Sequence, residues 1–433
     1  MKHPARMPRL VVADQHGNIT EHSSLAMAGM SAGVLTRLQP TDLIPLPTGS
    51  ELFALPGRLP VGLAPDGNAV IVENHPHDGG AVQAVAAFMA PAHTMLYNAA
   101  WRRLDAAPTL PLFAFTAVGW LHGRFWAAGF RSDPDRRQDM ALINQKKLVN
   151  RTKKRLSQSP NNRLIQHLGK CCLTYGCPAA RNLFLERFEA PLPTSPHCNA
   201  RCLGCISLQE SGCCRSTQDR ITFVPSPAEI EEIAISHLRA AQSAVVSFGQ
   251  GCEGEPLLQA KTIEQSIINI RKQTNRGTIN LNSNASRPEA VARLAAAGLD
   301  SLRVSLNSVR EPLYSAYYRP GGYFFADVKD SIRMMKKAGG FVSLNYFLQP
   351  GLTDSLDEYE ALIDFIAELQ PDMIQLRNLN MDPDWYFASL PQEKPMVARA
   401  PLGIATWLKK LRRRFPALAF GYFNPCLDPG SAA

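Results

Sequence analysis

The sequence lacks any long uninterrupted apolar run. The most apolar long stretch of its 433 residues, 111–130, is broken by His122, Gly123 and Arg124. A helix that crosses a bilayer needs about 20 residues largely free of charge, so this stretch predicts two buried strands joined by a turn. The N-terminus has no apolar segment of the length of a secretory signal, which predicts a cytoplasmic protein with no membrane partner.

Charged residues are scarce as well. They make up 19% of the chain, against 45% apolar residues, and this composition argues against intrinsic disorder. The length predicts two to three domains. The 46 basic and 37 acidic residues leave a net charge of +9, and basic residues gather at 131–160 and 409–414. A solvated helical face is the first interpretation of such a run, and a contact with nucleic acid or an acidic partner is the second.

The composition changes along the chain and divides it into four zones. Residues 1–130 alternate short apolar runs with turn signals and predict a β-rich accessory domain. Residues 131–181 predict a basic helical linker with a cysteine-rich end. Residues 182–390 alternate six apolar strands with helical patterns, which predicts an α/β fold with parallel strands and right-handed crossovers, a partial (β/α)6 barrel. Residues 391–433 form a C-terminal extension.

Local signals identify several elements within these zones. The turn residues after Val12 predict a hairpin, and Asp66-Gly67 between two apolar runs predicts another. Apolar residues recur on one face of the segment 227–238, as in a helix that packs against a sheet. Gly298 stands where a helix C-cap belongs.

Cysteines are crowded into one part of the sequence. The chain has ten, and eight of them lie between Cys171 and Cys214. Buried structural thiols would scatter with the core. In a reducing compartment, closely spaced cysteines are more often metal ligands or reactive thiols than a disulfide framework. The crowding therefore predicts a metal or cluster site.

The most specific pattern is PTSPHCNARCLGC, which follows the first predicted strand and contains Cys198, Cys202 and Cys205. Three thiolates on one loop can hold three irons of a [4Fe-4S] cluster and leave the fourth iron without a protein ligand. An open metal position can bind a substrate or cofactor. The alternative is a structural zinc closed by Cys213 or Cys214.

With this loop, residues 182–387 resemble the radical S-adenosylmethionine (SAM) superfamily, whose three-cysteine pattern also follows the first strand. The family usually has an aromatic residue before the third cysteine, where this chain has Gly204. After the second strand, Gly254, Glu255 and Pro256 resemble the Gly-Glu-Pro element that binds the methionyl amine of the cofactor. The resemblance implies a partial barrel of radical SAM type.

Later strand ends add polar residues that resemble the family's contacts to the ribose, carboxylate and adenine of the cofactor. These residues are Asn282, Asn284, Ser305, Asn307, Asn345 and Arg377. For each of them alone, an ordinary polar residue that satisfies backbone groups is the competing interpretation. In barrels of this kind, chemistry collects at the C-terminal ends of the strands, where all six stand.

The resemblance implies an enzyme that cleaves SAM with an electron from its [4Fe-4S] cluster and an external one-electron reductant, and uses the 5′-deoxyadenosyl radical to abstract hydrogen from a substrate. RNA, a peptide and a small molecule are the alternative candidate substrates, and the sequence slightly favours a macromolecule. The N-terminal domain or the tail from about Pro395 would serve as a lid. The alternative function is a non-catalytic zinc or iron-sulfur protein that binds nucleic acid or another protein.

The remaining cysteines suggest a second site. An auxiliary iron-sulfur or zinc site is a hypothesis, with a set such as Cys172, Cys177 and Cys214, and incidental buried thiols are the alternative. The thiols considered for it are Cys171, Cys172, Cys177, Cys213 and Cys214. Cys252 belongs to extra residues that depart from the family's usual spacing before the Gly-Glu-Pro element, and a reactive thiol is one interpretation of it.

Overall fold

The chain folds into two compact units that interleave along the sequence. The computed structural model describes residues 3–4, 6–136, 139–209, 212, 214–391 and 400–428. Unit 1 combines the segments Met1–Ala141, Phe347–Ile363 and Leu376–Pro416, and unit 2 combines Leu142–Tyr346, Asp364–Gln375 and Ala417–Ala433. The predicted zones follow the order of the sequence, whereas each unit takes segments from both halves of the chain. Arg137 in the first basic run, Cys213 and part of the C-terminal extension lie outside the described residues.

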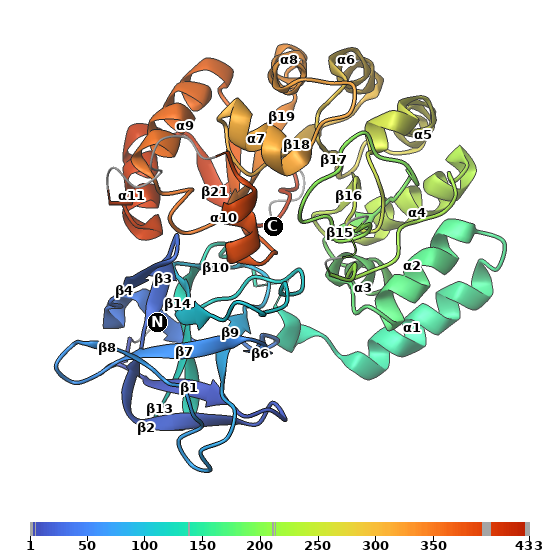
Figure 1. The fold of residues 1–433 in the computed structure, drawn as a ribbon. Helices are drawn as coiled ribbons and strands as arrows, with labels where there is room; N and C mark the ends of the chain where they lie inside the picture. The colour runs from blue at the N-terminus through green and yellow to red at the C-terminus, as the bar shows by residue number, and fades with distance from the viewer. Residues whose placement is uncertain are drawn as a thin grey trace. The chain divides into compact units, whose positions relative to one another are not determined.

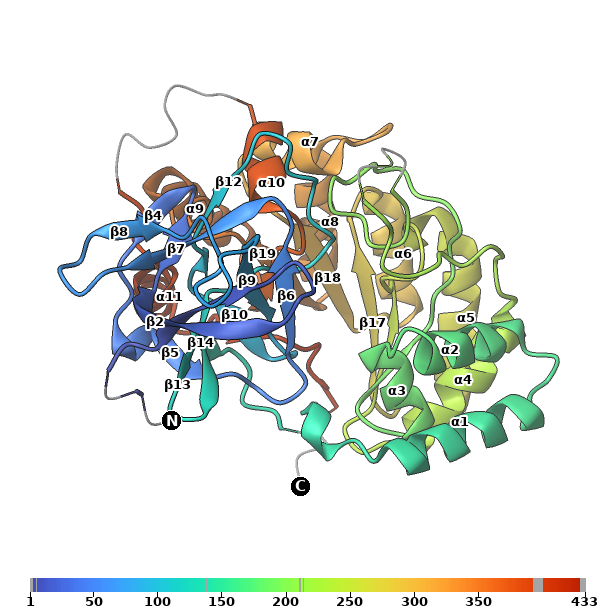
Figure 2. The same cartoon turned by 60° about the horizontal axis from the view of Figure 1, so that its bottom comes forward.

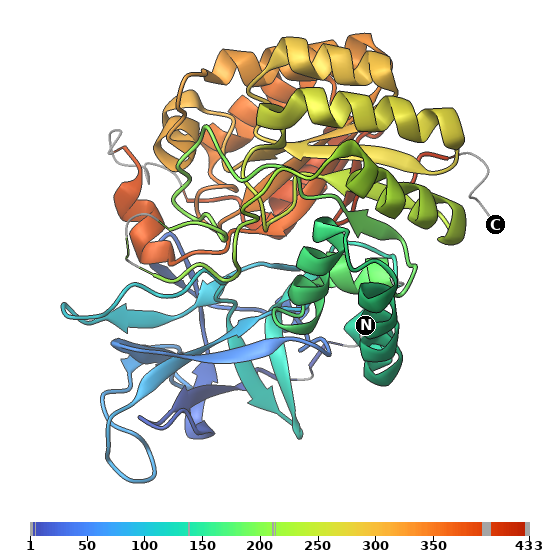
Figure 3. The ribbon, with the colours of Figure 1, turned by 90° about the vertical axis from the view of Figure 1, so that its right-hand side faces the viewer.

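Unit 1 is built mainly from short antiparallel strands, which confirms the predicted β-rich region; Figure 3 shows them in blue to cyan. One sheet path runs β10-β14-β13-β1-β2-β7-β12, and β11-β3-β4 form a smaller sheet. The strands of this region are β1 (Arg9–Ala13), β2 (Ile19–Met27), β3 (Gly29–Ser31), β4 (Val34–Thr36), β5 (Leu43–Pro45), β6 (Glu51–Leu55), β7 (Arg58–Leu63), β8 (Ala69–Ile71), β9 (Gln83–Phe88), β10 (His93–Met95), β11 (Asn98–Ala99), β12 (Trp101–Arg103), β13 (Val118–Leu121) and β14 (Arg124–Arg131). Two 3-10 turns, η1 (Pro40–Asp42) and η2 (Met140–Leu142), complete this part of the chain.

The predicted hairpins are present in this sheet. β1 pairs with β2 and β7 pairs with β8, both antiparallel. The apolar stretch 111–130 forms most of the β13–β14 hairpin, in which Leu121 and Arg124 are paired across a two-residue turn. The turn residues His122 and Gly123 have φ angles of 52° and 75°, the left-handed conformation that suits the twist of a two-residue hairpin. None of the described helices combines the length and the hydropathy needed to cross a bilayer.

A buried ion pair links the strands of unit 1 to its later segment. The Arg58 guanidinium lies 2.6 Å from the Asp382 carboxylate, with side chains 0% and 2% exposed. The same carboxylate oxygen accepts a hydrogen bond from the Leu110 amide at 3.0 Å. Because both charges are removed from water, each depends on the other for compensation.

Unit 2 contains a parallel sheet in the order β15-β16-β17-β18-β19-β20-β21, and Figure 1 shows α4, α5, α6 and α8 along its outer side. The strands are β15 (Glu189–Pro191), β16 (Val245–Phe248), β17 (Thr278–Ser283), β18 (Ser301–Leu306), β19 (Phe341–Leu348), β20 (Met373–Asn378) and β21 (Ala419–Gly421). β19 and β20 begin in unit 2, and their last residues belong to unit 1. The predicted parallel barrel with six strands is confirmed, with β21 as an unpredicted seventh.

Helices connect these strands, and their bounds follow local signals. The helical elements are α1 (Gln145–Gln158), α2 (Arg163–Leu173), α3 (Pro178–Phe184), α4 (Pro227–Ala240), η3 (Pro256–Gln259), α5 (Ala260–Gln273), α6 (Pro288–Ala297), α7 (Glu311–Tyr318), α8 (Phe325–Lys337), α9 (Leu356–Leu369), α10 (Pro383–Ser389) and α11 (Ile404–Arg414). α4 begins with a capping box between Ser226 and Glu229, and Gly298 ends α6 with a φ of 110°, as predicted. The sequence pattern predicts the first parallel strand from Leu183, but Leu183 and Phe184 belong to α3 and the strand begins only at Glu189.

The basic run forms α1, which lies beside α2 and α3 (Figure 2). Two of its arginines are already paired inside unit 2. Arg151 contacts Glu186 at 3.1 Å, and Arg155 contacts Glu232 at 3.2 Å. The exposed lysines of α1 therefore provide most of its uncompensated positive charge.

The C-terminal tail of unit 2 lies at the starting ends of the parallel strands. The Leu427 amide donates to Thr278 Oγ1 at 2.7 Å, and the Asp428 carboxylate accepts from the Gly277 amide at 3.0 Å. Both partners stand at the beginning of β17. Leu427 and Asp428 therefore lie away from the ends of the strands where catalytic loops follow, so these two residues are not part of the predicted lid.

We expect Asp382→Ala to lower the free energy of unfolding by about 3–5 kcal/mol, because it leaves the Arg58 charge buried without a partner. Thermal and chemical denaturation would measure the loss. Glu73→Ala is the matched control, since it removes the partner of Arg102 from an exposed pair and should change stability by less than about 1 kcal/mol. Equal effects of the two substitutions would contradict the role assigned to the buried pair.

Candidate cofactor site

The three cysteines of the predicted motif stand on the loop that follows β15. Burial is the main cause that raises the pKa of Cys198 to about 11 and that of Cys202 well above its usual value. The charges of neighbouring thiols contribute to both shifts, Cys205 among them, so the three sulfur atoms lie within electrostatic reach of one another. Clustered buried thiols of this kind become thiolates when a metal replaces their protons.

Backbone hydrogen bonds hold this loop against the end of α7 and the residues that follow it. The Arg201 amide donates to the Tyr318 carbonyl at 3.0 Å, and the Leu203 amide donates to the Tyr317 carbonyl at 2.9 Å. The Gly321 amide donates to a carbonyl of the same loop at 2.7 Å. The end of α7 therefore fixes the backbone between the cysteines.

The same helix supplies an aromatic wall that the sequence analysis missed. Tyr314 and Tyr318 are stacked with ring centroids 4.5 Å apart, and the hydroxyl groups of Tyr314 and Tyr323 are 3.1 Å apart. Burial raises the pKa of all three phenols, and the charge of Cys202 adds to the rise. The run LYSAYY in the sequence was the available signal.

Arg220 is a second residue that the sequence analysis missed. Its guanidinium donates to Cys205 Sγ at 3.4 Å and, through Nε, to Ser207 Oγ at 3.1 Å. The charge of Arg220 also opposes the burial that raises the pKa of Cys198. Nothing in the local sequence singles out this arginine, since the contact bridges fifteen residues of irregular loop.

The Gly-Glu-Pro element lies against the cysteine loop. The Gly254 amide donates to the Ser195 carbonyl at 2.7 Å, and the Glu255 amide donates to the His197 carbonyl at 2.8 Å. A Cβ atom on Gly254 would stand 2.0 Å from the carbonyl oxygen of His197, so only glycine allows this approach. Pro256 opens η3 directly afterwards.

The Glu255 carboxylate is buried and fully engaged with its surroundings. It accepts hydrogen bonds from Ser283 Oγ at 2.5 Å, the Asn284 amide at 2.8 Å and the Leu257 amide at 3.0 Å. Burial raises its pKa to about 7 against the opposing effect of these donors. Glu255 therefore connects the element to the end of β17 and positions its backbone.

Glu253 plays a comparable part that the sequence did not reveal. Its carboxylate accepts from the amides of Thr194 and Ser195 at 2.7 and 2.9 Å, and from the Gln250 amide at 2.7 Å. Burial raises its pKa to about 7 as well, while the three amides lower it. Glu253 thus joins the loop after β16 to the segment that leads into the cysteine motif.

Two of the predicted cofactor residues on β17 are engaged in the framework of unit 2. Asn284 Nδ2 donates to Asn199 Oδ1 at 2.8 Å, which connects it to the cysteine loop. Asn282 Nδ2 donates to the Gly249 carbonyl at 2.9 Å, and its Oδ1 accepts from Asn424 at 3.3 Å. The structure therefore brings Asn284 to the cysteine loop and turns Asn282 toward the C-terminal tail.

The predicted residues on β18 and β19 lie beside each other. Asn345 Nδ2 donates to Ser305 Oγ at 3.4 Å across neighbouring strands. Asn307 Nδ2 donates to the Leu313 carbonyl at 3.1 Å, which ties the end of β18 to α7. Arg377 belongs to unit 1, so the structure does not join it to the others within one unit.

The residues of unit 2 fit an iron-sulfur cluster with a polar ligand. The three thiols of the motif stand on one loop, and the charges of Cys198 and Cys205 contribute to the raised pKa of Cys202. The Tyr318 hydroxyl and Asn345 Oδ1 are two of several buried polar atoms in the described residues for which the structure shows no hydrogen-bond partner. Buried polar groups are normally satisfied, so these two can serve a bound polar molecule. Tyr318 packs at the cysteine loop, and Asn345 stands among the predicted cofactor residues.

Comparison with known proteins agrees with this geometry. The family model of the radical SAM superfamily matches residues 192–366, a span that contains the cysteine loop and the Gly-Glu-Pro element. These residues therefore form a radical SAM domain, which is a domain of SAM-dependent enzymes. Enzymes of this superfamily use a [4Fe-4S] cluster and SAM. No curated protein matches the chain.

Several solved structures share part of the fold. HydG, a maturase of the [FeFe]-hydrogenase, is 16% identical with a TM-score of 0.38, and the match covers 64% of this chain and 66% of that one. Methylornithine synthase (PylB) is 14% identical with a TM-score of 0.38, over 64% and 72% of the two chains. A radical SAM methyltransferase from Sphaerobacter thermophilus is 17% identical with a TM-score of 0.36, over 53% and 64%. Similarity this low carries no information on substrate or reaction.

We expect Gly254→Ala to lower stability by at least about 3 kcal/mol, because its Cβ would overlap a backbone oxygen that cannot move aside. Gly251→Ala is a matched control in the same loop. Its Cβ would meet only the ends of the Gln218 and Ile206 side chains at 2.6 Å, and those can turn away, so we expect a loss of about 1 kcal/mol. Melting temperatures of both variants test this, and an equal loss would contradict the close approach.

Proposed function

We propose that Cys198, Cys202 and Cys205 ligate a [4Fe-4S] cluster and that the neighbouring element Gly254-Glu255-Pro256 forms part of the SAM site. The observation that supports this most directly is the pairing of the Gly-Glu-Pro backbone with the segment that enters the cysteine motif. Two elements that the superfamily uses for cluster and cofactor thereby form one structure.

The chain's own residues would orient the cofactor and keep water away from it. The tyrosines of α7 close one side of the cysteine loop, and Glu255 holds the backbone of the Gly-Glu-Pro element through its three hydrogen bonds. The unpartnered Asn345 Oδ1 would accept a hydrogen bond from a polar group of the cofactor, and the Tyr318 hydroxyl would donate to or accept from another. When bound, cluster and SAM supply a single electron and a 5′-deoxyadenosyl radical that abstracts hydrogen from the substrate.

The substrate remains a proposal, and we favour a macromolecule, RNA or a peptide, over a small molecule. The net charge of +9 and the exposed lysines of α1 support a polyanionic partner, since phosphate contacts dominate nucleic-acid affinity. An external one-electron reductant, as the superfamily generally needs, is the second partner we propose. No observation favours the alternative of a non-catalytic binding protein.

We expect replacement of Cys198, Cys202 or Cys205 by Ala to abolish reductive SAM cleavage, because each substitution removes a ligand of the cluster. The fold should persist, since hydrogen bonds from the end of α7 hold the loop backbone. Release of 5′-deoxyadenosine under a strong reductant measures activity, and circular dichroism measures the fold. Cys426→Ala is the control on a remote tail thiol. Cleavage retained by any one of the motif variants would refute the ligand assignment.

Arg220→Gln should shift the reduction potential of the cluster to more negative values, because it removes a positive charge and a hydrogen bond to Cys205 Sγ. Redox titration followed by electron paramagnetic resonance measures the potential. Arg215→Gln removes the same charge from an exposed position in the same loop and should leave the potential nearly unchanged. Equal shifts in the two variants would show that Arg220 acts only through net charge.

A further inference from the structure

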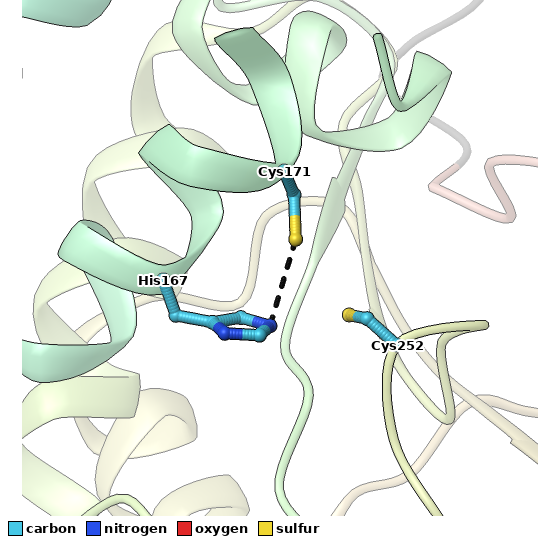
Figure 4. Close-up of side chains that lie close together, drawn as sticks. All are labelled: His167, Cys171 and Cys252. Atoms are coloured by element: carbon cyan, nitrogen blue, oxygen red, sulfur yellow. Dashed lines mark hydrogen bonds between the residues drawn. The ribbon is translucent and has the colours of Figure 1, made fainter. Parts of the chain in front are cut away.

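A second group of metal-ligating side chains lies in unit 2, outside the cysteine motif. It consists of His167 and Cys171 on α2 and Cys252 in the loop after β16, and Figure 4 shows the three side chains pointing toward one another. Their ligand atoms all lie within 4.8 Å of one another. The two residues of α2 are four positions apart and therefore share one face of the helix.

We propose that His167, Cys171 and Cys252 bind one zinc ion, at a site separate from the [4Fe-4S] cluster. The zinc would be tetrahedral, with the imidazole, two thiolates and a fourth ligand from solvent or a nearby group.

The spacing of the atoms fits a mononuclear centre. Cys171 Sγ lies 3.6 Å from His167 Nε2. In tetrahedral coordination at the usual bond lengths, a zinc-bound nitrogen and sulfur stand about 3.6 Å apart, and two sulfurs stand about 3.8 Å apart. The sulfur ligands of a cubane cluster bind different irons and stand farther apart. The group is therefore matched to a single ion.

The chemistry of the donors selects the metal. Two thiolates and one imidazole form a set typical of zinc and disfavour the hard cations magnesium and calcium. The thiol residues are well shielded, with Cys171 1% and Cys252 4% exposed, so the sulfur side of a bound ion would be shielded from water. His167 is only partly buried and has Phe223 at its edge, with ring centroids 6.4 Å apart. Its exposed side offers a path for the ion.

The position of Cys252 gives such a centre a structural role. Cys252 directly precedes Glu253, the residue that joins this loop to the segment entering the cysteine motif. The Cys252 carbonyl also accepts a hydrogen bond from the Ile221 amide at 2.8 Å. A zinc ion between α2 and this loop would anchor the extra residues that precede the Gly-Glu-Pro element and hold that element in place.

This assignment differs from the set considered from the sequence. Cys172 lies next to Cys171 but turns toward Thr152, whose Oγ1 is 3.5 Å from its sulfur. Helix geometry explains the difference, since only Cys171 shares a face with His167. The hypothesised set of Cys172, Cys177 and Cys214 therefore does not match the group that the structure assembles.

Metal analysis of the full-length protein tests the proposal. We expect protein purified anaerobically, supplied with zinc and loaded with its iron-sulfur cluster to contain close to one zinc per chain. Cys171→Ser and Cys252→Ser should each reduce the zinc content by more than about tenfold and leave the iron content unchanged, because the substituted side chain no longer supplies a thiolate. Cys172→Ser is the matched control, since it removes an equally buried neighbouring thiol, and it should retain zinc.

Cobalt substitution of the wild-type chain gives a readout that needs no variant. A tetrahedral cobalt-thiolate centre shows intense visible bands, which an adventitious surface ion lacks. The proposal is overturned if the wild-type protein takes up no zinc or cobalt, or if Cys171→Ser retains zinc. It is equally overturned if mass spectrometry finds Cys171 and Cys252 joined as a disulfide in the anaerobic protein. None of these outcomes depends on SAM cleavage, so the zinc proposal and the proposed function can fail independently of each other.

Discussion

The cofactor site depends on one close backbone approach. Gly254 and Glu255 donate their amides to the carbonyls of Ser195 and His197, and the missing Cβ of Gly254 is what allows this contact. Two loops that follow neighbouring parallel strands are thereby joined into a single surface. Every other feature of the site, from the cysteine loop to the end of β17, is positioned relative to this junction.

Buried carboxylates secure the junction from both sides. The Glu253 carboxylate accepts hydrogen bonds from three backbone amides. The Glu255 carboxylate accepts hydrogen bonds from two backbone amides and one hydroxyl group. Removing a carboxyl group from water is costly, and here the cost is offset by donors whose positions are set by the strand ends. These hydrogen bonds fix the positions of the two loops, which suits chemistry that requires a reactive group to be held in place.

The opposite end of the parallel sheet is closed by the C-terminal tail. Asn424 donates to Glu189 Oε1 at 2.8 Å and accepts from Gln375 Nε2 at 2.8 Å, so it joins β15 and β20 across the sheet interior. These buried amide contacts fill part of the sheet interior with polar side chains of the chain itself. The polar interior also explains why the strands carry asparagine and serine among their apolar residues.

The sequence by itself determined the class of fold and the two main motifs. Apolar strands alternating with helical patterns specify a parallel sheet, and the spacing of Cys198, Cys202 and Cys205 is local enough to be read directly. Hairpins at Asp66-Gly67 and His122-Gly123 were also visible, because a two-residue turn depends on its own residues.

Only the tertiary structure decided which distant side chains meet. Arg220 beside Cys205, the tyrosines of α7 and the pairing of Cys252 with α2 depend on loop paths that no periodicity encodes. The seventh strand β21 is three residues long and joins the sheet through pairing with β20, a partner far away in the sequence. Local patterns report local conformations, whereas these contacts arise from the packing of segments brought together by the whole chain.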